Sequence, residues 1–122
     1  VIQALLRTNF NGIVHGFELN DLACQAANSK VETYELSDKY KIDNSCFFDA
    51  NKPQASYLIS NPPYLPALDN KLLQPLLHGG LEGITITQQL LTLNYENVLV
   101  MVSSYSNPVG LINYAIAQGY SV

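Results

Sequence analysis

The chain has 122 residues, enough for one domain, and its 48% apolar and 13% charged residues allow a buried core. Six Lys and Arg residues against ten Asp and Glu give a formal net charge of -4 with no basic stripe, which disfavours nucleic-acid binding through phosphate neutralisation. No run of about 18 apolar residues is present, so the sequence predicts no transmembrane helix. Two distant cysteines, Cys24 and Cys46, exclude a CxxC metal site and suit free thiols in a reducing cytoplasm.

The first part of the chain predicts a helix, a strand and a second helix. Residues 1–8 place apolar side chains at near-helical spacing, and residues 12–18 predict a short strand that ends in an acid. Asn20 or Asp21 is suited to cap the following helix, because either side chain can accept a hydrogen bond from the first turn. We expect this helix to pack through four residues, Leu22, Ala23, Ala26 and Ala27.

Two further strand patterns lie in the middle of the chain. Residues 31–36 suit either a strand or an extension of the preceding helix. Residues 45–48 predict a short strand that ends in Asp49. Residues 55–60 predict the clearest strand, which runs directly into Asn-Pro-Pro-Tyr at residues 61–64. The two consecutive prolines remove two backbone donors, so the strand must end there.

The last third of the chain repeats this alternation. Residues 85–93 predict a helix, and residues 97–102 form an apolar run that predicts a central strand buried on both faces. A final helix is expected to begin at Pro108 and to end at Gly119. Short apolar runs that alternate with helical patterns are typical of an α/β fold with a mostly parallel sheet.

Polar side chains follow three of the predicted strands, at Glu18, Asp49 and Asn61. In open parallel sheets, ligands bind outside the carboxyl ends of the strands. A carboxylate can accept hydrogen bonds from two vicinal hydroxyls, which suits Glu18 to a ribose. Taken singly, Glu18 is better explained as a loop acid or a helix N-terminal charge, and Asp49 is better explained as part of an ordinary turn. Three in succession predict one site along the sheet edge.

The sequence Asn61-Pro62-Pro63-Tyr64 is of a different kind, because two prolines fix the directions of the carbonyl oxygens around them. The Asn61 side-chain oxygen and a proline carbonyl, held side by side, are two acceptors for the two hydrogens of one NH₂ group, and the Tyr64 ring can stack on it. Hydrogen bonds to both acceptors stabilise the nitrogen as it attacks an electrophile, and this stabilisation arises mainly in the transition state. The alternative is a rigid loop with a packed tyrosine.

Residues 60–64 resemble the (Asn/Asp)-Pro-Pro-(Tyr/Phe) motif of class I S-adenosylmethionine-dependent methyltransferases that modify NH₂ nitrogens. The surrounding segment is most similar to the release-factor glutamine N5-methyltransferase group. In that group the motif is followed by Ile/Leu-Pro and then by Gly-Gly-x-(Asp/Glu)-Gly at the start of a helix. Residues 65–66 (Leu-Pro) and 79–83 (Gly-Gly-Leu-Glu-Gly) match both features, and residues 100–108 resemble the later strand–helix unit.

The resemblance implies a Rossmann-like fold, with helices on both faces of a mostly parallel sheet, and S-adenosyl-L-methionine as cofactor without any metal. It implies that Glu18 binds the cofactor ribose, that Asp49 lies near the adenine, and that Asn61 lies beside both the cofactor and the substrate nitrogen. Residues 62–64 would frame the substrate amide. The implied reaction is direct in-line methyl transfer to a glutamine of a protein such as a translation release factor, in the cytoplasm and away from membranes.

One feature departs from the family, in which a glycine-rich loop follows the first strand. In dinucleotide-binding folds the acid lies about 20 residues beyond this loop, but only 17 residues precede Glu18. We therefore expect the first strand and its loop upstream of Val1 and the last strands downstream of Val122. Residues 1–122 would be a partial methyltransferase domain that binds cofactor weakly and is inactive by itself.

Two other functions remain open. An N6-adenine methyltransferase of RNA or DNA shares the tetrapeptide, although such enzymes generally lack the segment matched by residues 79–83. The third possibility is a catalytically inactive, methyltransferase-like module that acts as a binding partner.

Overall fold

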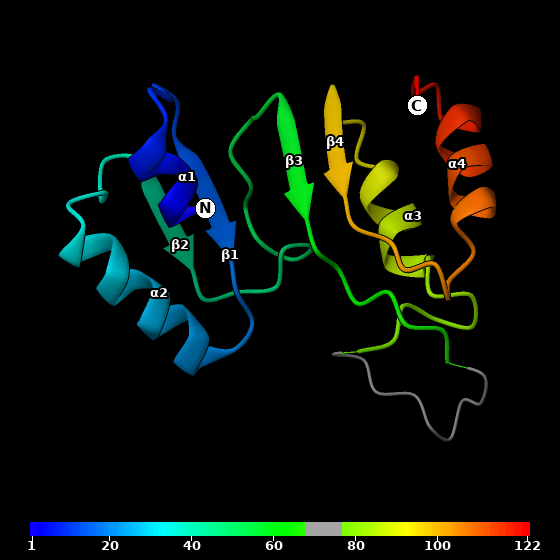
Figure 1. Cartoon of the computed structure of the whole chain (residues 1–122), viewed down its shortest axis with the longest axis horizontal. Coiled ribbons are helices and arrows are strands. Elements are labelled where there is room, and N and C mark those ends of the chain that lie inside the picture. Colours follow the sequence, from blue (N-terminus) through cyan, green and yellow to red (C-terminus); the bar gives the residue numbers. More distant parts are fainter. Residues whose placement is uncertain (68–76) are drawn as a thin grey trace. The chain divides into compact units, whose positions relative to one another are not determined.

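A computed structural model describes residues 1–67 and 77–122. The chain forms two compact units, Val1–Gln54 and Ala55–Val122. In the described part of each unit, one pair of short parallel strands is combined with two helices (Figure 1). This arrangement confirms the predicted α/β class, whereas a single Rossmann-like sheet across residues 1–122 stays a prediction. No helix in the described residues is long and apolar enough to cross a membrane.

The first unit follows the order helix, strand, helix, strand. Its elements are α1 (Ile2–Arg7), β1 (Val14–Phe17), α2 (Asp21–Thr33) and β2 (Tyr40–Asp43). The two strands are parallel, with Val14 opposite Tyr40 and Phe17 opposite Asp43. Helix α2 is the connection between them and packs against β2 (Figure 1), as parallel strands require a crossover of this kind.

The core of the first unit lies on one face of the strand pair. Its buried residues are Leu5 from α1, Val31 from α2, and Leu36, and the partly buried residues packed against them are Ile2, Val14, Tyr40 and Ile42. Side chains alternate between the two faces of a strand, so His15 and Lys41 lie on the opposite face. Both are exposed. The first unit therefore covers only one face of its strands with helices.

Helix α2 is capped as predicted but packs through a different face. The Asn20 side chain accepts a hydrogen bond of 2.9 Å from the N–H group of Ala23. The buried residues of the helix are Cys24 and Val31, two turns apart. Leu22 is 75% exposed. The predicted packing face was therefore wrong, since Ala23 and Ala26 are exposed as well and only Ala27 is half-buried.

Residues 31–33 continue the helix, and no part of segment 31–36 forms a strand. Helix α2 ends at Thr33. Glu35 then adopts a positive φ of 54°, which turns the chain out of the helical direction. Leu36 returns to the core, where it is 7% exposed.

The second strand of the first unit lies earlier in the chain than predicted. The strand is Tyr40–Asp43, and the prediction of a strand at residues 45–48 is wrong. Residues 46–50 form a turn instead, because the N–H groups of Asp49 and Ala50 both bond to the carbonyl oxygen of Cys46. In β2, half-buried apolar residues alternate with exposed polar ones, which is the pattern of a strand with one covered face. The continuous apolar run at residues 46–48 is a stronger strand pattern in the sequence than this alternation, so the strand was predicted there.

The second unit contains the remaining elements in the predicted order. These are β3 (Tyr57–Ser60), α3 (Thr85–Leu91), β4 (Asn97–Val100) and α4 (Pro108–Ala117). Strands β3 and β4 are parallel, with Leu58 opposite Val98 and Ser60 opposite Val100. Helices α3 and α4 pack against each other (Figure 1).

The core of the second unit joins its two helices to strand β4. Its buried residues are Ile84, Leu91, Leu111 and Ala115, and Val98, Tyr114 and Tyr120 pack against them. The opposite face of the strand pair exposes 70% of Tyr57, 72% of Ile59 and 66% of Leu99. The prediction that residues 97–102 form a strand buried on both faces is therefore wrong. Helices on both faces of one sheet stay a prediction.

Candidate functional site

Residues 61–64, which we call the Asn61–Tyr64 turn, form an irregular segment that begins where β3 ends, as predicted. The carbonyl of Ser60 accepts a hydrogen bond of 3.1 Å from the N–H group of Met101, which links the end of β3 to the neighbouring strand segment. Pro62 is buried, whereas Asn61 is exposed and Pro63 and Tyr64 are half-buried. The proline side of the turn thus anchors it in the protein, and the Asn61 side chain remains accessible to a ligand.

The glycine-rich segment 79–83 pairs with the residues that follow the turn. The N–H group of Leu65 donates to the carbonyl of Leu77 at 3.1 Å, and the N–H group of Gly79 donates to the carbonyl of Leu65 at 2.9 Å. The N–H group of Ala67 in turn donates to the carbonyl of Gly80 at 2.9 Å. The two segments that carry the family resemblance therefore lie side by side.

Two glycines of this segment are required by the closeness of this packing. A Cβ atom at Gly79 would lie 2.5 Å from the carbonyl oxygen of Pro63. A Cβ atom at Gly83 would lie 2.7 Å from the Ser106 hydroxyl, and Gly83 also has a positive φ of 71°. Side chains are excluded at both positions, so the backbone can approach the proline turn closely.

Ser106 is a contact of the turn that no sequence pattern indicated. Its hydroxyl donates a hydrogen bond to the carbonyl of Tyr64. The next residue, Asn107, donates its N–H group to the carbonyl of Glu82 at 3.0 Å, and its side chain caps α4 by accepting from Gly110 at 2.8 Å. The loop after β4 thus holds both the turn and the glycine-rich segment. A serine in a loop is too common to signal such a contact from sequence.

Glu18 lies directly after β1, as predicted, and is half-buried. Its N–H group donates to the carbonyl of Asp43 at 3.0 Å, and its carbonyl accepts from the Asn44 side chain at 3.0 Å. Its carboxylate oxygen Oε1 accepts from the N–H group of Asn20, the cap of α2, at 2.8 Å. Glu18 therefore serves as a helix N-terminal charge, and among the described residues its oxygen Oε2 has no hydrogen bond.

Asp49 does not lie at a strand end. It is exposed, lies six residues beyond the end of β2, and donates its N–H group to the carbonyl of Cys46 at 3.1 Å within the turn. The polar residues that do follow the apolar part of β2 are Asp43 and Asn44. Both were missed from the sequence, because the predicted strand lay over Phe47 and its neighbours.

The turn that carries Asp49 is held by Lys52. The ammonium group donates hydrogen bonds to the carbonyls of Phe47, Phe48 and Ala50, at 2.8, 3.2 and 3.0 Å. It also lies 5.0 Å from the centre of the Phe47 ring. That ring meets Phe17, the last residue of β1, edge-on at 5.3 Å. An aromatic cluster therefore borders the carboxyl end of β1.

Gly16 lies in β1 and Gly12 shortly before it, and both glycines face aromatic rings of the first unit. A Cβ atom at Gly16 would lie 2.9 Å from the ring of Tyr40, and one at Gly12 would lie 2.9 Å from a ring carbon of Phe10. Burial raises the pKa of the Tyr40 phenol, and the negative charge of Glu18 raises it further. Aromatic rings therefore occupy the space beside both glycines in this structure.

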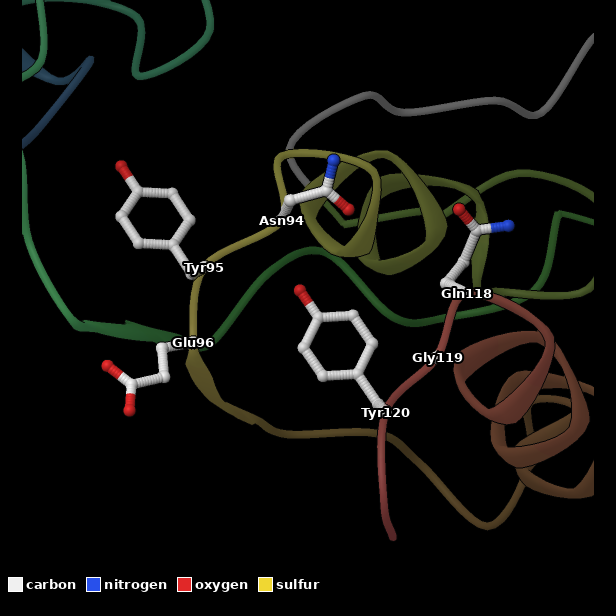
Figure 2. A pocket seen from close by; sticks show the side chains of 6 residues that line it. All are labelled: Asn94, Tyr95, Glu96, Gln118, Gly119 and Tyr120. Carbon is white, nitrogen blue, oxygen red and sulfur yellow. The ribbon is translucent and has the colours of Figure 1, made fainter.

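A pocket of about 210 Å³ lies elsewhere in the second unit (Figure 2). It is lined by Asn94, Tyr95, Glu96, Gln118, Gly119 and Tyr120. Residues 94–96 directly precede β4, so the pocket lies at the amino ends of the strand pair, whereas Asn61 follows a carboxyl end. Its position therefore separates it from the Asn61–Tyr64 turn.

The predicted site residues are distributed over both units. Glu18 and Asp49 belong to the first unit, and residues 61–64 belong to the second. One shared site formed by all of them stays a prediction. Among residues 1–67 and 77–122, no group of three or more His, Cys, Asp and Glu side chains is placed to hold a metal ion.

No family model matches the chain. The chain is similar to the release factor glutamine methyltransferase of Thermosynechococcus vestitus, with 28% identity over 91 residues that cover 65% of this chain and 31% of that protein. This similarity supports a relationship to methyltransferases. The chain spans less than a third of the length of this curated relative.

Proposed function

We propose that the protein is an S-adenosylmethionine-dependent N-methyltransferase that modifies the amide nitrogen of a protein glutamine. The observation that carries the proposal is the geometry of the Asn61–Tyr64 turn. An exposed asparagine follows a parallel strand directly, on a proline-rich turn that residues 79–83 hold from one side. The similarity to a protein named for glutamine methylation supports the choice of reaction.

The proposed role of the turn is to hold and orient the acceptor amide. The two N–H bonds of the amide donate to the Asn61 side-chain oxygen and to the Pro62 carbonyl, and the Tyr64 ring packs on the amide plane. S-adenosylmethionine supplies an electrophilic methyl group when it is bound. The nitrogen lone pair forms the new N–C bond, the electrons of the broken S–C bond stay on sulfur, and the nitrogen releases one proton to water. The acceptors gain strength as the nitrogen becomes positive, which lowers the barrier.

Glu18 is proposed to bind the cofactor ribose. It lies at the carboxyl end of β1, and its oxygen Oε2 has no hydrogen bond among the described residues, so it can accept one from a hydroxyl. The neighbouring Phe17 and Phe47 provide apolar surface suited to a nucleobase. A role for Asp49 near the adenine rests on the family resemblance alone, because the strand that would have positioned it is absent at residues 45–48.

The test measures methyl transfer from labelled S-adenosylmethionine by the full-length protein that contains this chain. Two acceptors are compared, a translation release factor and an adenine-containing oligonucleotide. The acidic net charge favours the protein acceptor. Asn61→Ala is expected to reduce transfer about 100-fold, because it removes one acceptor that acts in the transition state. The control is Asn113→Ala, on the exposed side of α4.

Each outcome decides a different part of the proposal. Transfer to the oligonucleotide alone would replace glutamine by adenine as the substrate. Undiminished transfer by Asn61→Ala would refute the role of the turn. Failure of the wild type to bind S-adenosylhomocysteine in calorimetry would favour a catalytically inactive binding module.

A further inference from the structure

We infer that Ser106 is a positioning residue for the Asn61–Tyr64 turn. Its hydroxyl fixes the Tyr64 carbonyl and thereby sets the direction in which residues 61–63 present their acceptors. This inference rests on the proposed function, because it assigns the direction of the turn a role in methyl transfer. Nothing in the family resemblance assigns a role to this serine.

The turn needs partners from elsewhere in the chain. Pro62 and Pro63 have no N–H groups to donate, and residues 61–64 form no backbone hydrogen bond to one another. The Tyr64 carbonyl instead accepts from the Ser106 hydroxyl, 42 residues later in the chain. Both residues are half-buried, so this hydrogen bond is partly shielded from competing water.

Ser106 itself is held in place. Its N–H group donates to the carbonyl of Ser103 at 3.1 Å, and the following residue, Asn107, is bonded both to Glu82 and to the start of α4. On its other side, a Cβ atom at Gly83 would lie 2.7 Å from the Ser106 hydroxyl and 3.0 Å from the Ser106 Cβ atom. Ser106 therefore has little freedom to move with the turn and can act as a fixed point.

For catalysis, we expect loss of the Ser106 hydroxyl to lower kcat without changing the affinity for the cofactor product. Loss of the hydroxyl frees the Tyr64 carbonyl, which allows the ψ angles of the turn to change, because proline fixes only φ. We expect Ser106→Ala to lower kcat about tenfold, as one hydrogen bond is lost. The affinity for S-adenosylhomocysteine should change less than about twofold, since the proposed ribose contact belongs to Glu18.

The experiment compares three variants of the full-length protein. Ser106→Ala removes the hydroxyl, and Ser106→Thr retains it and should restore most of kcat. Ser104→Ala is the matched control, because Ser104 is exposed in the same loop. Hydrogen exchange of the Leu65 and Gly79 amides, which bond beside the turn, reports on its rigidity without any need for activity. Exchange should accelerate in Ser106→Ala alone.

The two readouts separate this inference from the proposed function. Unchanged amide exchange and unchanged kcat in Ser106→Ala would overturn the inference while leaving methyl transfer established. A loss of kcat that Ser106→Thr does not recover would also overturn it, since the hydroxyl would then not be the cause. A wild-type protein without methyl transfer would refute the proposed function, and the positioning of the turn by Ser106 would then be decided by amide exchange.

Discussion

Gly79 lies so close to Pro63 that a Cβ atom on the glycine would be 2.5 Å from the proline carbonyl oxygen. The two residues are 16 positions apart in the chain, and their contact joins the Asn61–Tyr64 turn to the glycine-rich segment 79–83. Real Cβ atoms essentially never approach an oxygen so closely, so the absence of a side chain is a condition for this contact.

Gly79→Ala is therefore expected to destabilise the second unit by about 1–3 kcal/mol, as overpacking does in a rigid environment. Urea denaturation measures this loss. A useful comparison is Gly119→Ala, because Gly119 has a positive φ of 92° but a Cβ atom added there would meet no atom within 4 Å. The free energy of unfolding of Gly119→Ala should fall by only about 1 kcal/mol, because the substitution strains the backbone. Equal losses in both variants would show that the crowding at Pro63 is relieved at low cost.

Strand β3 offers a second comparison between adjacent residues. Leu58 is 8% exposed and lies opposite Val98, which packs against the core, whereas Ile59 is 72% exposed. Leu58→Ala should lower the free energy of unfolding by about 2–4 kcal/mol, because it leaves a cavity. Ile59→Ala should change it by less than about 1 kcal/mol. A large loss in Ile59→Ala would mean that another surface covers this face in solution.

Much of the fold follows from local signals in the sequence. The Asn20 cap, the end of β3 at the prolines and the start of α4 at Pro108 each depend on one residue and its immediate neighbours. The packing face of α2 does not, because small and apolar residues occupy several sides of this helix. The side of α2 that is buried depends on where β2 lies, because the helix packs against this strand. The sequence predicts that strand at residues 45–48 and not at Tyr40–Asp43, so it does not predict the packing face.

The candidate site likewise contains residues that local sequence signals predict and residues that they do not. Asn61 and Glu18 directly follow strands, so the apolar runs before them predict their positions. Ser106 contacts a carbonyl 42 residues earlier, and a contact of this range leaves no periodic or local pattern. Asp49 was misplaced because Cys-Phe-Phe resembles a buried strand, although its aromatic rings form a local cluster around Lys52.

Tyr40 provides a prediction for alkaline pH. Burial, followed by the charges of Glu18 and Cys24, raises its pKa above the usual 10.0. The folded state thus holds the phenol proton more tightly than the unfolded state, and this contribution to stability is complete below pH 10.0 and lost as pH rises through the folded-state pKa. Tyr40→Phe should flatten the decline of stability above pH 10.0 in urea titrations. Tyr105→Phe, at a tyrosine that is 83% exposed, is the control and should leave the decline unchanged.

Lys52 gives a final prediction, on the turn that carries Asp49. Its ammonium group bonds to three carbonyls and lies over the Phe47 ring, so one side chain holds most of the turn. Hydrogen bonds to a charged group contribute about 1.5–3 kcal/mol, and water competes at this half-buried position. Lys52→Met retains the apolar stem but removes the donors.

The expected loss for Lys52→Met is about 1–2 kcal/mol in urea denaturation, together with faster hydrogen exchange at the Asp49 and Ala50 amides that bond within the turn. Lys41→Met is the matched control, because Lys41 is exposed on β2 and faces away from the core. It should have little effect on either measurement. If Lys52→Met leaves both amides as protected as in the wild type, the turn is fixed by its own backbone bonds to Cys46, and the lysine only covers the Phe47 ring.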